Sequence, residues 1–479
     1  MIADFRPICI FYLGDSIMHA FFVAVGSVQG EASRRTHPVN SMPSRSTPSD
    51  SPFPPAAAGR GPGPQAPVGW PSGPETVLWP DPGNPRAALY VFYRVGSADE
   101  PPAPTGLAHF LEHMMFNGSA RFPDGDFDRI LEAAGGSNNA YTTEEFTVYH
   151  EQFPAAAIAT AFELEIDRMR ALLIDAGRVD RERGVILSER EAGVDNDPVA
   201  QFLEEIQAVA CAGTSYAHPV IGWSEDIERI DPELLGRFYD RHYRCSRPTV
   251  IGVGGIDPGH WNRLCVDMGL DQPAPGCPPL PSMPGSAGQH PAGERRIESA
   301  AAVGSPYLAL VFPVPAATAA SALADELLWT ILVGGVASRL QSLLVERRAA
   351  AIALETYRIG RLVPGRQVLL VTLAPNKRPQ TVERLLRETL EQLTEAGPTE
   401  AERIRAVNQR LATYYRHLES VSGRAELLGR AWTLHRDLSR IGTYPGLLEA
   451  VSSTEIRDAA RAAFGHGGWT VGTLYPEGQ

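Results

Sequence analysis

Cysteines are few for a chain of this length, and their arrangement excludes two kinds of site. The sequence contains 5 cysteines among 479 residues, and no two of them form a Cys-x-x-Cys pair. An odd number of scattered cysteines does not make a disulfide framework, and zinc sites built from thiolates normally use paired cysteines. We therefore interpret the cysteines as small core residues, with at most one exposed thiol.

Basic charge is also scarce relative to acidic charge. Lys and Arg together number 43, Asp and Glu number 56, and the formal net charge is -13. Because phosphate binding needs a basic face, nucleic acid is excluded as the main partner. A hydrophobic content of 43% and a charged content of 21% are ordinary for a soluble globular protein. The length predicts two or three structural units rather than a single core.

The sequence also lacks an apolar run long enough to span a bilayer, which takes about 20 residues. Two shorter runs near the N-terminus, ICIFYLG (8–14) and AFFVAVGSV (20–28), are separated by Asp15 and His19. Two interpretations stay open: a secretory signal segment with a weak basic region, or a chain start placed too far upstream. The first predicts an exported, periplasmic protein and the second a cytoplasmic one.

Two stretches rich in Pro and Gly divide the chain. Residues 1–74 are predicted to be a disordered leader, including the possible signal segment, because residues 31–74 cannot bury enough apolar surface to offset the entropy of ordering. Residues 271–294 are predicted to be a linker. We expect a zinc-binding half at 75–270 and a second half without the zinc motif at 295–479.

The two halves share a coarse order of elements. Each opens with a β-rich run, continues with a helix, further strands and long helices, and closes with a strand, PTVIGVGGI (248–256) or WTVGTLYPE (469–477). Strands in a run followed by helices in a run are typical of α+β folds. We predict an α+β fold of two homologous halves, each a mostly antiparallel sheet covered by helices on one face, which suggests an internal duplication.

The stretch GLAHFLEHMMFNG (106–118) places two histidines and a glutamate in an otherwise apolar helix. His109, Glu112 and His113 have the spacing i, i+3 and i+4 and therefore share one helix face. A catalytic zinc takes neutral imidazoles and keeps three protein ligands. The spacing predicts two ligands of one Zn2+ per chain, a third ligand elsewhere, and Glu112 placed to take a proton from a water that the ion activates. The alternative is a structural helix whose histidines are satisfied by hydrogen bonds.

His-x-x-Glu-His is the inverted form of the His-Glu-x-x-His zinc motif. With its flanking residues it resembles the metal helix of the pitrilysin/insulinase family of zinc metallopeptidases, in the short branch that includes the processing peptidases. Three further segments resemble this family: GGSNNAYTTEEFTVYHEQFP (135–154), RERGVILSEREAG (181–193) and HPVIGW (218–223). The resemblance is strong over the first half and looser in the second.

The resemblance implies a role for each matching residue of the metal site. His109 and His113 match the two zinc histidines, and Glu189 matches the zinc carboxylate. Glu112 matches the general base. Glu182, two helical turns before Glu189, matches a supporting catalytic acid that orients a ligand.

The implied function is that of a zinc-dependent endopeptidase that hydrolyses peptides or unfolded segments in a chamber closed by two chains. Asn139 and Ala140 match an edge strand whose backbone binds an extended peptide substrate by strand addition. The alternative is a non-catalytic scaffold or peptide-binding subunit of the same fold. Inactive relatives usually lose a metal-site residue, whereas His109, Glu112 and His113 are all present.

The second half departs from the family pattern at two positions. Members that are complete in one active unit carry an Arg and a Tyr after a Gly-Gly-x-x-Ser-Arg-Leu stretch. That stretch is retained here as GGVASRL (334–340), but Val345 and Ile352 stand at the aligned positions and Tyr357 comes five places too late. The family's chamber takes four α+β units, of which this chain has two. The resemblance therefore implies a heterodimer whose homologous partner supplies the Arg and Tyr, with a homodimer as the alternative.

Overall fold

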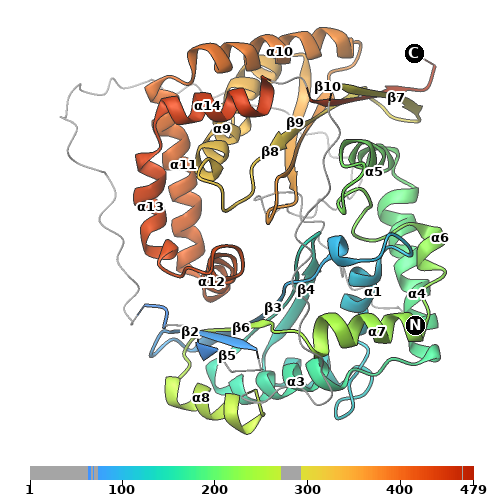
Figure 1. Cartoon of the computed structure of the whole chain (residues 1–479), viewed down its shortest axis with the longest axis vertical. Helices are drawn as coiled ribbons and strands as arrows, with labels where there is room; N and C mark the ends of the chain where they lie inside the picture. Colours follow the sequence, from blue (N-terminus) through green and yellow to red (C-terminus); the bar gives the residue numbers. More distant parts are fainter. Residues whose placement is uncertain (1–62, 66–67, 70–73, 271–292, 466–467, 479) are drawn as a thin grey trace, which may run out of the picture.

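The computed structural model describes residues 63–65, 68–69, 74–270, 293–465 and 468–478. This part of the chain forms two β-sheets, each backed by helices, with one sheet in the lower and the other in the upper part of Figure 1. Most of the predicted leader and nearly all of the predicted linker lie outside the described residues. None of the described helices is both long and apolar enough to cross a membrane.

The first half is built on a six-stranded sheet with the order β1-β2-β6-β3-β5-β4. Its strands are β1 (Val68–Gly69), β2 (Glu75–Pro80), β3 (Arg86–Tyr93), β4 (Ser137–Thr142), β5 (Thr147–Pro154) and β6 (Thr249–Gly254). Its α-helices are α1 (Leu107–Met114), α2 (Asp126–Ala133), α3 (Ile158–Ala171), α4 (Ala176–Arg190), α5 (Pro198–Ala210), α6 (Ser224–Ile227), α7 (Pro232–Tyr239) and α8 (Pro258–Asp267). Short 3-10 or π-helical turns are η1 (Ser97–Asp99), η2 (Ala155–Ala157), η3 (Glu191–Asp195) and η4 (Asp240–Arg244).

The second half is built on a five-stranded sheet with the order β7-β11-β8-β10-β9. Its strands are β7 (Arg295–Ala301), β8 (Tyr307–Val314), β9 (Ala351–Ile359), β10 (Gly365–Leu373) and β11 (Thr470–Pro476). Its helices are α9 (Ala322–Val333), α10 (Pro379–Ala396), α11 (Glu400–Glu419), α12 (Val421–His435), α13 (Arg440–Ala450) and α14 (Ser453–Phe464), with one π-helical turn, η5 (Gln341–Arg347).

Strand β1 lies within the segment predicted to be a disordered leader. Its residues Val68 and Gly69 pair with Thr76 and Glu75 of β2 at the edge of the first sheet. An edge pairing this short needs only a few backbone hydrogen bonds, which a Pro- and Gly-rich composition does not prevent. The expectation that ordered structure begins near residue 75 was therefore wrong by one short strand.

Both sheets have the same topology once β1 is set aside. In each, the first strand pairs with the last, and the second, fourth and third strands follow in that order. The pairs β2–β6 and β7–β11 are parallel, and the other pairs along these orders are antiparallel. This shared order confirms the predicted α+β fold of two homologous halves.

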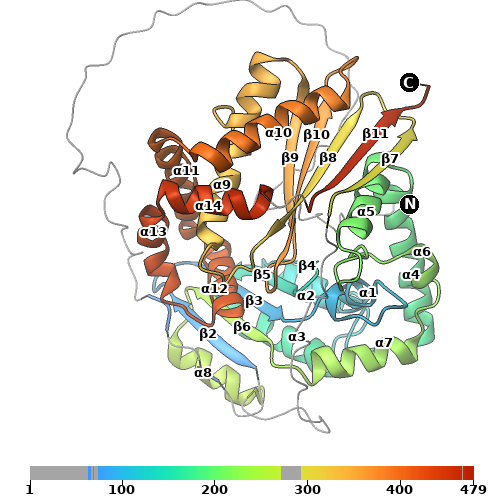
Figure 2. The same ribbon diagram turned by 45° about the horizontal axis from the view of Figure 1, so that its top comes forward.

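One helix from each half covers the free face of the other half's sheet. Helix α12 packs on β3 and β6 of the first sheet, and α5 packs on β7, β8 and β11 of the second (Figure 2). The two helices are counterparts. In the first half, β5 is followed along the chain by the helices α3, α4 and α5, and in the second half β10 is followed by α10, α11 and α12. The prediction of helices on one face of each sheet holds for the main helix layers but did not foresee this exchange.

The exchanged helices explain why β3 reads as a continuous apolar run. Leu89 and Val91 face the main core of the first half, whereas Tyr90 and Phe92 point to the opposite face and pack with Leu428 and other residues of α12. Fully burying one large apolar side chain contributes about 1.5–3 kcal/mol. Contacts of this kind therefore bind the two halves firmly together.

Glycines permit the close approach at both crossings. A Cβ atom added at Gly429 of α12 would lie 2.0 Å from the Phe92 ring, and one added at Gly472 of β11 would lie 2.7 Å from Phe202 and Ile206 of α5. At such distances the facing side chains, or the backbones that carry them, would have to shift. Polar contacts also join the halves, among them the 2.8 Å ion pair between Arg424 and Asp81.

We expect Gly429→Ala to destabilise the protein by about 1–3 kcal/mol, because the new methyl group overpacks the contact with Phe92. The matched control is Gly236→Ala in α7, where an added Cβ meets nothing within 4 Å. Alanine in a helix is favoured over glycine by up to about 1 kcal/mol, so the control should be neutral or stabilising. Chemical denaturation measures both variants, and equal stabilisation of both would contradict the close approach at Gly429.

Candidate metal centre

Helix α1, which carries His109, Glu112 and His113, is buried along its whole length. Its N-terminus lacks a capping side chain at Gly106, the residue before the helix. The carboxylate of Glu100 supplies the cap instead, because its two oxygens accept the N–H groups of Gly106 and Ala108, each at 2.7 Å. Burial raises the pKa of Glu100 to about 8, although the two backbone hydrogen bonds act in the opposite direction.

The structure brings His109, His113 and Glu189 together from two different helices. One potential ligand atom from each of the three residues lies within 4.8 Å of the other two. Nε2 of His113 is 3.2 Å from Oε2 of Glu189, and Nε2 of His109 is 3.9 Å from Oε1 of the same carboxylate. Two imidazole nitrogens and one carboxylate oxygen are the donor set of many catalytic zinc sites, so these residues fit the predicted ion.

Glu182 lies two turns before Glu189 on the same face of α4 and contacts the other nitrogen of His113. Its Oε1 atom is 2.8 Å from Nδ1 of His113, and its Oε2 atom accepts a 2.5 Å hydrogen bond from Asn117. A carboxylate accepts only, so Nδ1 of His113 carries the proton when the ring is neutral. The lone pair on Nε2 is then directed at the ligand cluster, which is the orientation that metal binding requires.

The electrostatics of the two histidines differ. Burial lowers the pKa of His109 to about 3, so this ring is neutral and available as a ligand. Burial alone would also lower the pKa of His113, but Glu182 and Glu189 outweigh it and raise that pKa to about 10. The two carboxylates thus create a negative environment that holds a proton on His113, and a cation can take the place of that proton.

The end of α4 that carries Glu189 is fixed by its neighbour, Arg190. This buried guanidinium makes a bidentate contact with Glu204, at 3.0 and 2.8 Å, and donates to the carbonyl of Gly222 at 2.8 Å. Bidentate contacts of this kind set the orientation as well as adding stability. The position of Glu189 therefore depends on α5 and on the segment before α6.

Glu112 is fully buried beside the ligand cluster. Its Oε2 atom accepts a 2.5 Å hydrogen bond from the hydroxyl of Thr142 at the end of β4, while its Oε1 atom has no hydrogen-bond partner among the described residues. Burial raises the pKa of Glu112 to about 7, and His113 and Thr142 act in the opposite direction. A carboxyl group with this pKa can both accept and return a proton near neutral pH.

Strand β4, which carries Asn139 and Ala140, is the edge strand of the first sheet. The side-chain oxygen of Asn139 accepts the N–H of Ala140 at 2.8 Å. That backbone donor faces away from β5, on the side of β4 that no described strand occupies. Both residues therefore lie where a further strand would add, although neither lines the cavity described next.

A cavity of about 460 Å3 adjoins the ligand cluster and lies between the two halves. His109, Thr142 and Glu189 line it from the first half, and residues of β9, the following loop and α12 line it from the second half. Tyr357 and Arg358 are among the second-half residues. The site is therefore built from both halves of the chain.

Val345 and Ile352, the positions that the sequence resemblance aligns with an Arg and a Tyr, are not among the residues that line this cavity. Val345 packs against the second-half core, and Ile352 is 54% exposed on β9. Arg358 and Arg361 do line the cavity. They follow Ile352 by six and nine places, and neither was predicted from the sequence to be a site residue. Thr142 was likewise not singled out from the sequence, although it lies in the quoted segment 135–154.

Comparison with known proteins identifies the family. The model for Insulinase (Peptidase family M16) matches residues 76–223, and the model for the Peptidase M16 inactive domain matches residues 229–410. The chain belongs to peptidase family M16, the insulinase family. The first match covers the residues of the candidate metal site in this M16 chain, and the second begins just before α7 and ends within α11.

Relatives of this M16 chain include proteins named as zinc proteases. An uncharacterized zinc protease of Streptomyces coelicolor is 26% identical over 390 residues, covering 79% of this chain and 83% of the relative. The zinc protease PqqE of Helicobacter pylori is 27% identical over 349 residues, covering 70% and 76%. The mitochondrial-processing peptidase subunit beta of Blastocladiella emersonii is 30% identical over 187 residues, covering only 39% and 40%.

A solved structure supports the fold. The crystal structure of a protease from Helicobacter pylori superposes with a TM-score of 0.81 at 23% identity, covering 86% of this M16 chain and 99% of that chain. At this level of identity the likeness establishes the fold alone.

We expect the purified chain to bind about one Zn2+, since three ligands converge on one point. Glu189→Gln should reduce the zinc content after dialysis to near zero, because an amide is a poorer ligand than a carboxylate. The matched control is Glu191→Gln, which removes an exposed carboxylate two residues away. Metal analysis by mass spectrometry measures all three proteins, and full zinc content in Glu189→Gln would contradict the assignment of that ligand.

We expect Glu182→Ala to weaken zinc binding by about 10- to 100-fold, since the orientation of His113 is lost. Glu182→Gln should weaken it less, because the amide oxygen can still accept from Nδ1 of His113. Asp180→Asn, at an exposed position of α4, serves as the control. Competition with a fluorescent zinc chelator measures the affinities, and equal affinities in all variants would exclude an orienting role.

Proposed function

We propose that this protein is a zinc-dependent endopeptidase that cleaves peptides or unfolded segments. The observation that carries the proposal is the convergence of His109, His113 and Glu189 within 4.8 Å, with the buried carboxyl group of Glu112 beside them. The names of the zinc protease relatives are consistent with it. His113 has a carboxylate oxygen at each ring nitrogen, at 2.8 and 3.2 Å, whereas a neutral structural histidine donates from one nitrogen and needs only one such acceptor.

Each residue of the site has a part in the proposed mechanism. His109, His113 and Glu189 would hold a Zn2+ ion, which when bound would supply a Lewis acid that polarises the scissile carbonyl and lowers the pKa of water. Glu112 accepts the proton from the attacking water and returns it to the leaving amine. Thr142 holds the Glu112 carboxylate in place through Oε2, which leaves Oε1 for the proton. Glu182 keeps His113 in the tautomer that presents Nε2.

The substrate is proposed to bind in extended form along β4. Asn139 and Ala140 occupy the free edge of the sheet, and Thr142 at the end of the same strand contacts Glu112. Strand addition to such an edge uses backbone hydrogen bonds and therefore accepts many sequences. In the structure Asn139 occupies the N–H of Ala140 and would have to release it.

We further propose that two chains close the reaction chamber. Val345 and Ile352 are apolar at the positions where self-contained members have Arg and Tyr, so a homologous partner is expected to supply these groups. Donors that stabilise the oxyanion contribute about 2.7–4 kcal/mol to lowering the barrier. The name of the processing-peptidase relative describes a subunit, which is consistent with a two-chain enzyme.

We expect Glu112→Gln to retain zinc and to lose peptide cleavage by at least about 100-fold, because no group remains to accept the proton. Glu132→Gln, at an exposed position of α2, should cleave normally. The assay uses unfolded casein with and without a chelator, and with zinc restored afterwards. It is run on the chain alone and together with any homologous chain that co-purifies. Undiminished turnover by zinc-loaded Glu112→Gln would refute the mechanism.

A further inference from the structure

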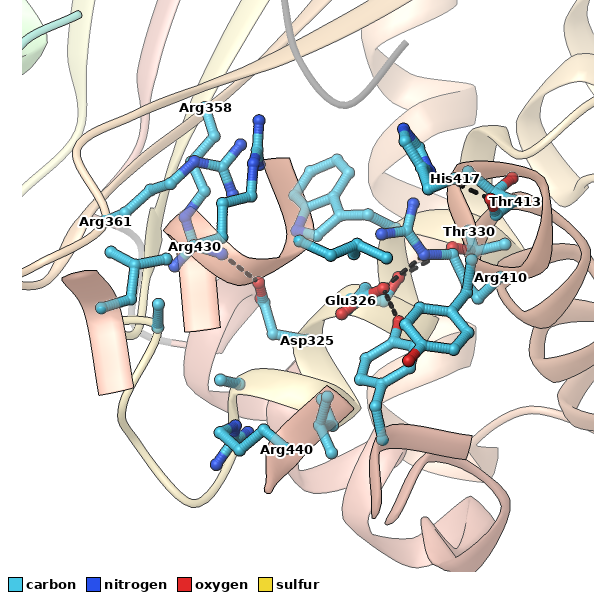
Figure 3. A pocket seen from close by; sticks show the side chains of 18 of the residues that line it. Asp325, Glu326, Thr330, Arg358, Arg361, Arg410, Thr413, His417, Arg430 and Arg440 are labelled. Carbon is cyan, nitrogen blue, oxygen red and sulfur yellow. Dashed lines mark hydrogen bonds and ion pairs between the residues drawn. The ribbon is translucent and has the colours of Figure 1, made fainter. Parts of the chain in front are cut away.

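A second cavity, of about 420 Å3, lies in the second half beside the metal cavity. Both cavities are lined by Tyr357, Arg358, Arg361, Glu426 and Arg430, so the same side chains form the wall between them. Figure 3 shows Arg358, Arg361 and Arg430 on one side of this second cavity and Arg410 and His417 on the other. Its volume is within the range of about 300–1,000 Å3 that is usual for ligand sites.

The sign of the charge reverses between the two cavities. The charged residues that line the metal cavity are Glu144, Glu145, Glu189, Asp197, Glu204, Glu355 and Glu426, against Arg358, Arg361 and Arg430. The second cavity instead has Arg358, Arg361, Arg410, Arg430 and Arg440, against Asp325, Glu326 and Glu426. An excess of arginine is notable in a chain whose net charge is -13, and a cavity lined by one sign of charge concentrates ligands of the other.

The three carboxylates of the second cavity each contact one arginine. Arg358 is 3.3 Å from Asp325, Arg430 is 2.7 Å from Glu426, and Arg410 contacts Glu326. The wall of the cavity therefore carries five guanidinium groups and three carboxyl groups, while Glu144 and Asp437, which do not line it, lie close enough to Arg361 and Arg440 to interact with them electrostatically. Burial also raises the pKa of Asp325 to about 6, although Arg358 acts in the opposite direction.

The second cavity occupies the place in its half that the metal centre occupies in the first. Helix α9 follows the second strand of its sheet as α1 does, and the contact of Asp325 with Arg358 near the end of β9 corresponds to that of Glu112 with Thr142 at the end of β4. Helix α11 is the counterpart of α4. Where α4 presents carboxylates seven places apart, α11 presents Arg410 and His417, also seven places apart.

We propose that this basic cavity binds a carboxylate of the peptide whose scissile bond lies at the metal centre. The inference depends on the proposed peptidase function. A guanidinium group matches a carboxylate with two parallel hydrogen bonds, and several of them around one cavity favour a carboxylate over a neutral group. The carboxylate is either the C-terminus of the peptide or an acidic side chain, and the two sources are separated by the test.

The test measures binding in a Glu112→Gln background, so that no cleavage occurs. The probes are four short fluorescein-labelled peptides that differ only in their last two residues and in their C-terminal group. Two end in Glu-Glu, one with a free C-terminus and one as the amide. Two end in Gln-Gln, again one with a free C-terminus and one as the amide. Fluorescence anisotropy gives the affinities. We expect the fully acidic peptide to bind about tenfold more tightly than the fully neutral one. The two intermediate peptides show which carboxylate is responsible.

The decisive variant is the double substitution Arg361→Gln and Arg440→Gln, which leaves the contacts of Asp325, Glu326 and Glu426 with Arg358, Arg410 and Arg430 intact. We expect the preference for the acidic peptide to fall to less than about twofold. The control is Arg384→Gln on the exposed face of α10, which should keep the tenfold preference. Equal binding of acidic and neutral peptides by the unsubstituted cavity, or an undiminished preference in the double variant, would overturn the proposal.

Two further measurements separate the possible failures. Zinc content and thermal unfolding report whether the double variant is folded. If it is not folded, the test is made on the Glu112→Gln chain instead. Its preference for the acidic peptide must decrease as salt is added, since screening weakens a charge-based preference. Salt-independent preference would overturn the proposal. If acidic peptides are preferred but the unsubstituted chain cleaves no peptide, the cavity assignment stands and the peptidase function is refuted. If the unsubstituted chain cleaves peptides but acidic peptides are not preferred, the peptidase function stands and the cavity assignment is refuted.

Discussion

The site depends on the burial of α1. Because every residue of this helix is buried, its polar side chains have no access to bulk water and must find partners in the interior. Those partners come from distant segments: Glu100 caps the helix, Glu182 binds His113, and Thr142 binds Glu112. A helix held at both ends and along one face keeps its two imidazoles in fixed directions, which is the preorganisation that a catalytic metal site needs.

Two halves of one topology carry opposite chemistry. The first half gathers carboxylates and imidazoles, whereas the equivalent place in the second half gathers guanidinium groups. The strand order survives in both, since the buried sheet and its helix layers tolerate few changes. The side chains that line the cavities are free of that constraint, so duplicated units can diverge in charge without losing their architecture.

The parts of the site that the sequence could predict are those set by local geometry or by resemblance. Helical spacing alone places His109 and His113 on one face, and the family motif points to Glu189. Thr142 and Glu100 could not be predicted in this way, because their contacts with α1 span elements whose relative placement depends on tertiary packing. Likewise an amphipathic pattern in α5 or α12 shows that one face is buried but not which sheet it covers.

The exchange of α5 and α12 has a consequence for how the chain matures. During synthesis the first sheet emerges well before residues 421–435, so the face that α12 will cover stays exposed until the chain has been made beyond residue 435. Neither half can complete its interior alone, and the nascent chain passes through a stage in which a large apolar surface is exposed and prone to aggregation. We therefore regard the molecule as a single cooperative folding unit, despite its two sheets, because β3 and β6 of the first half depend on α12 of the second for their cover.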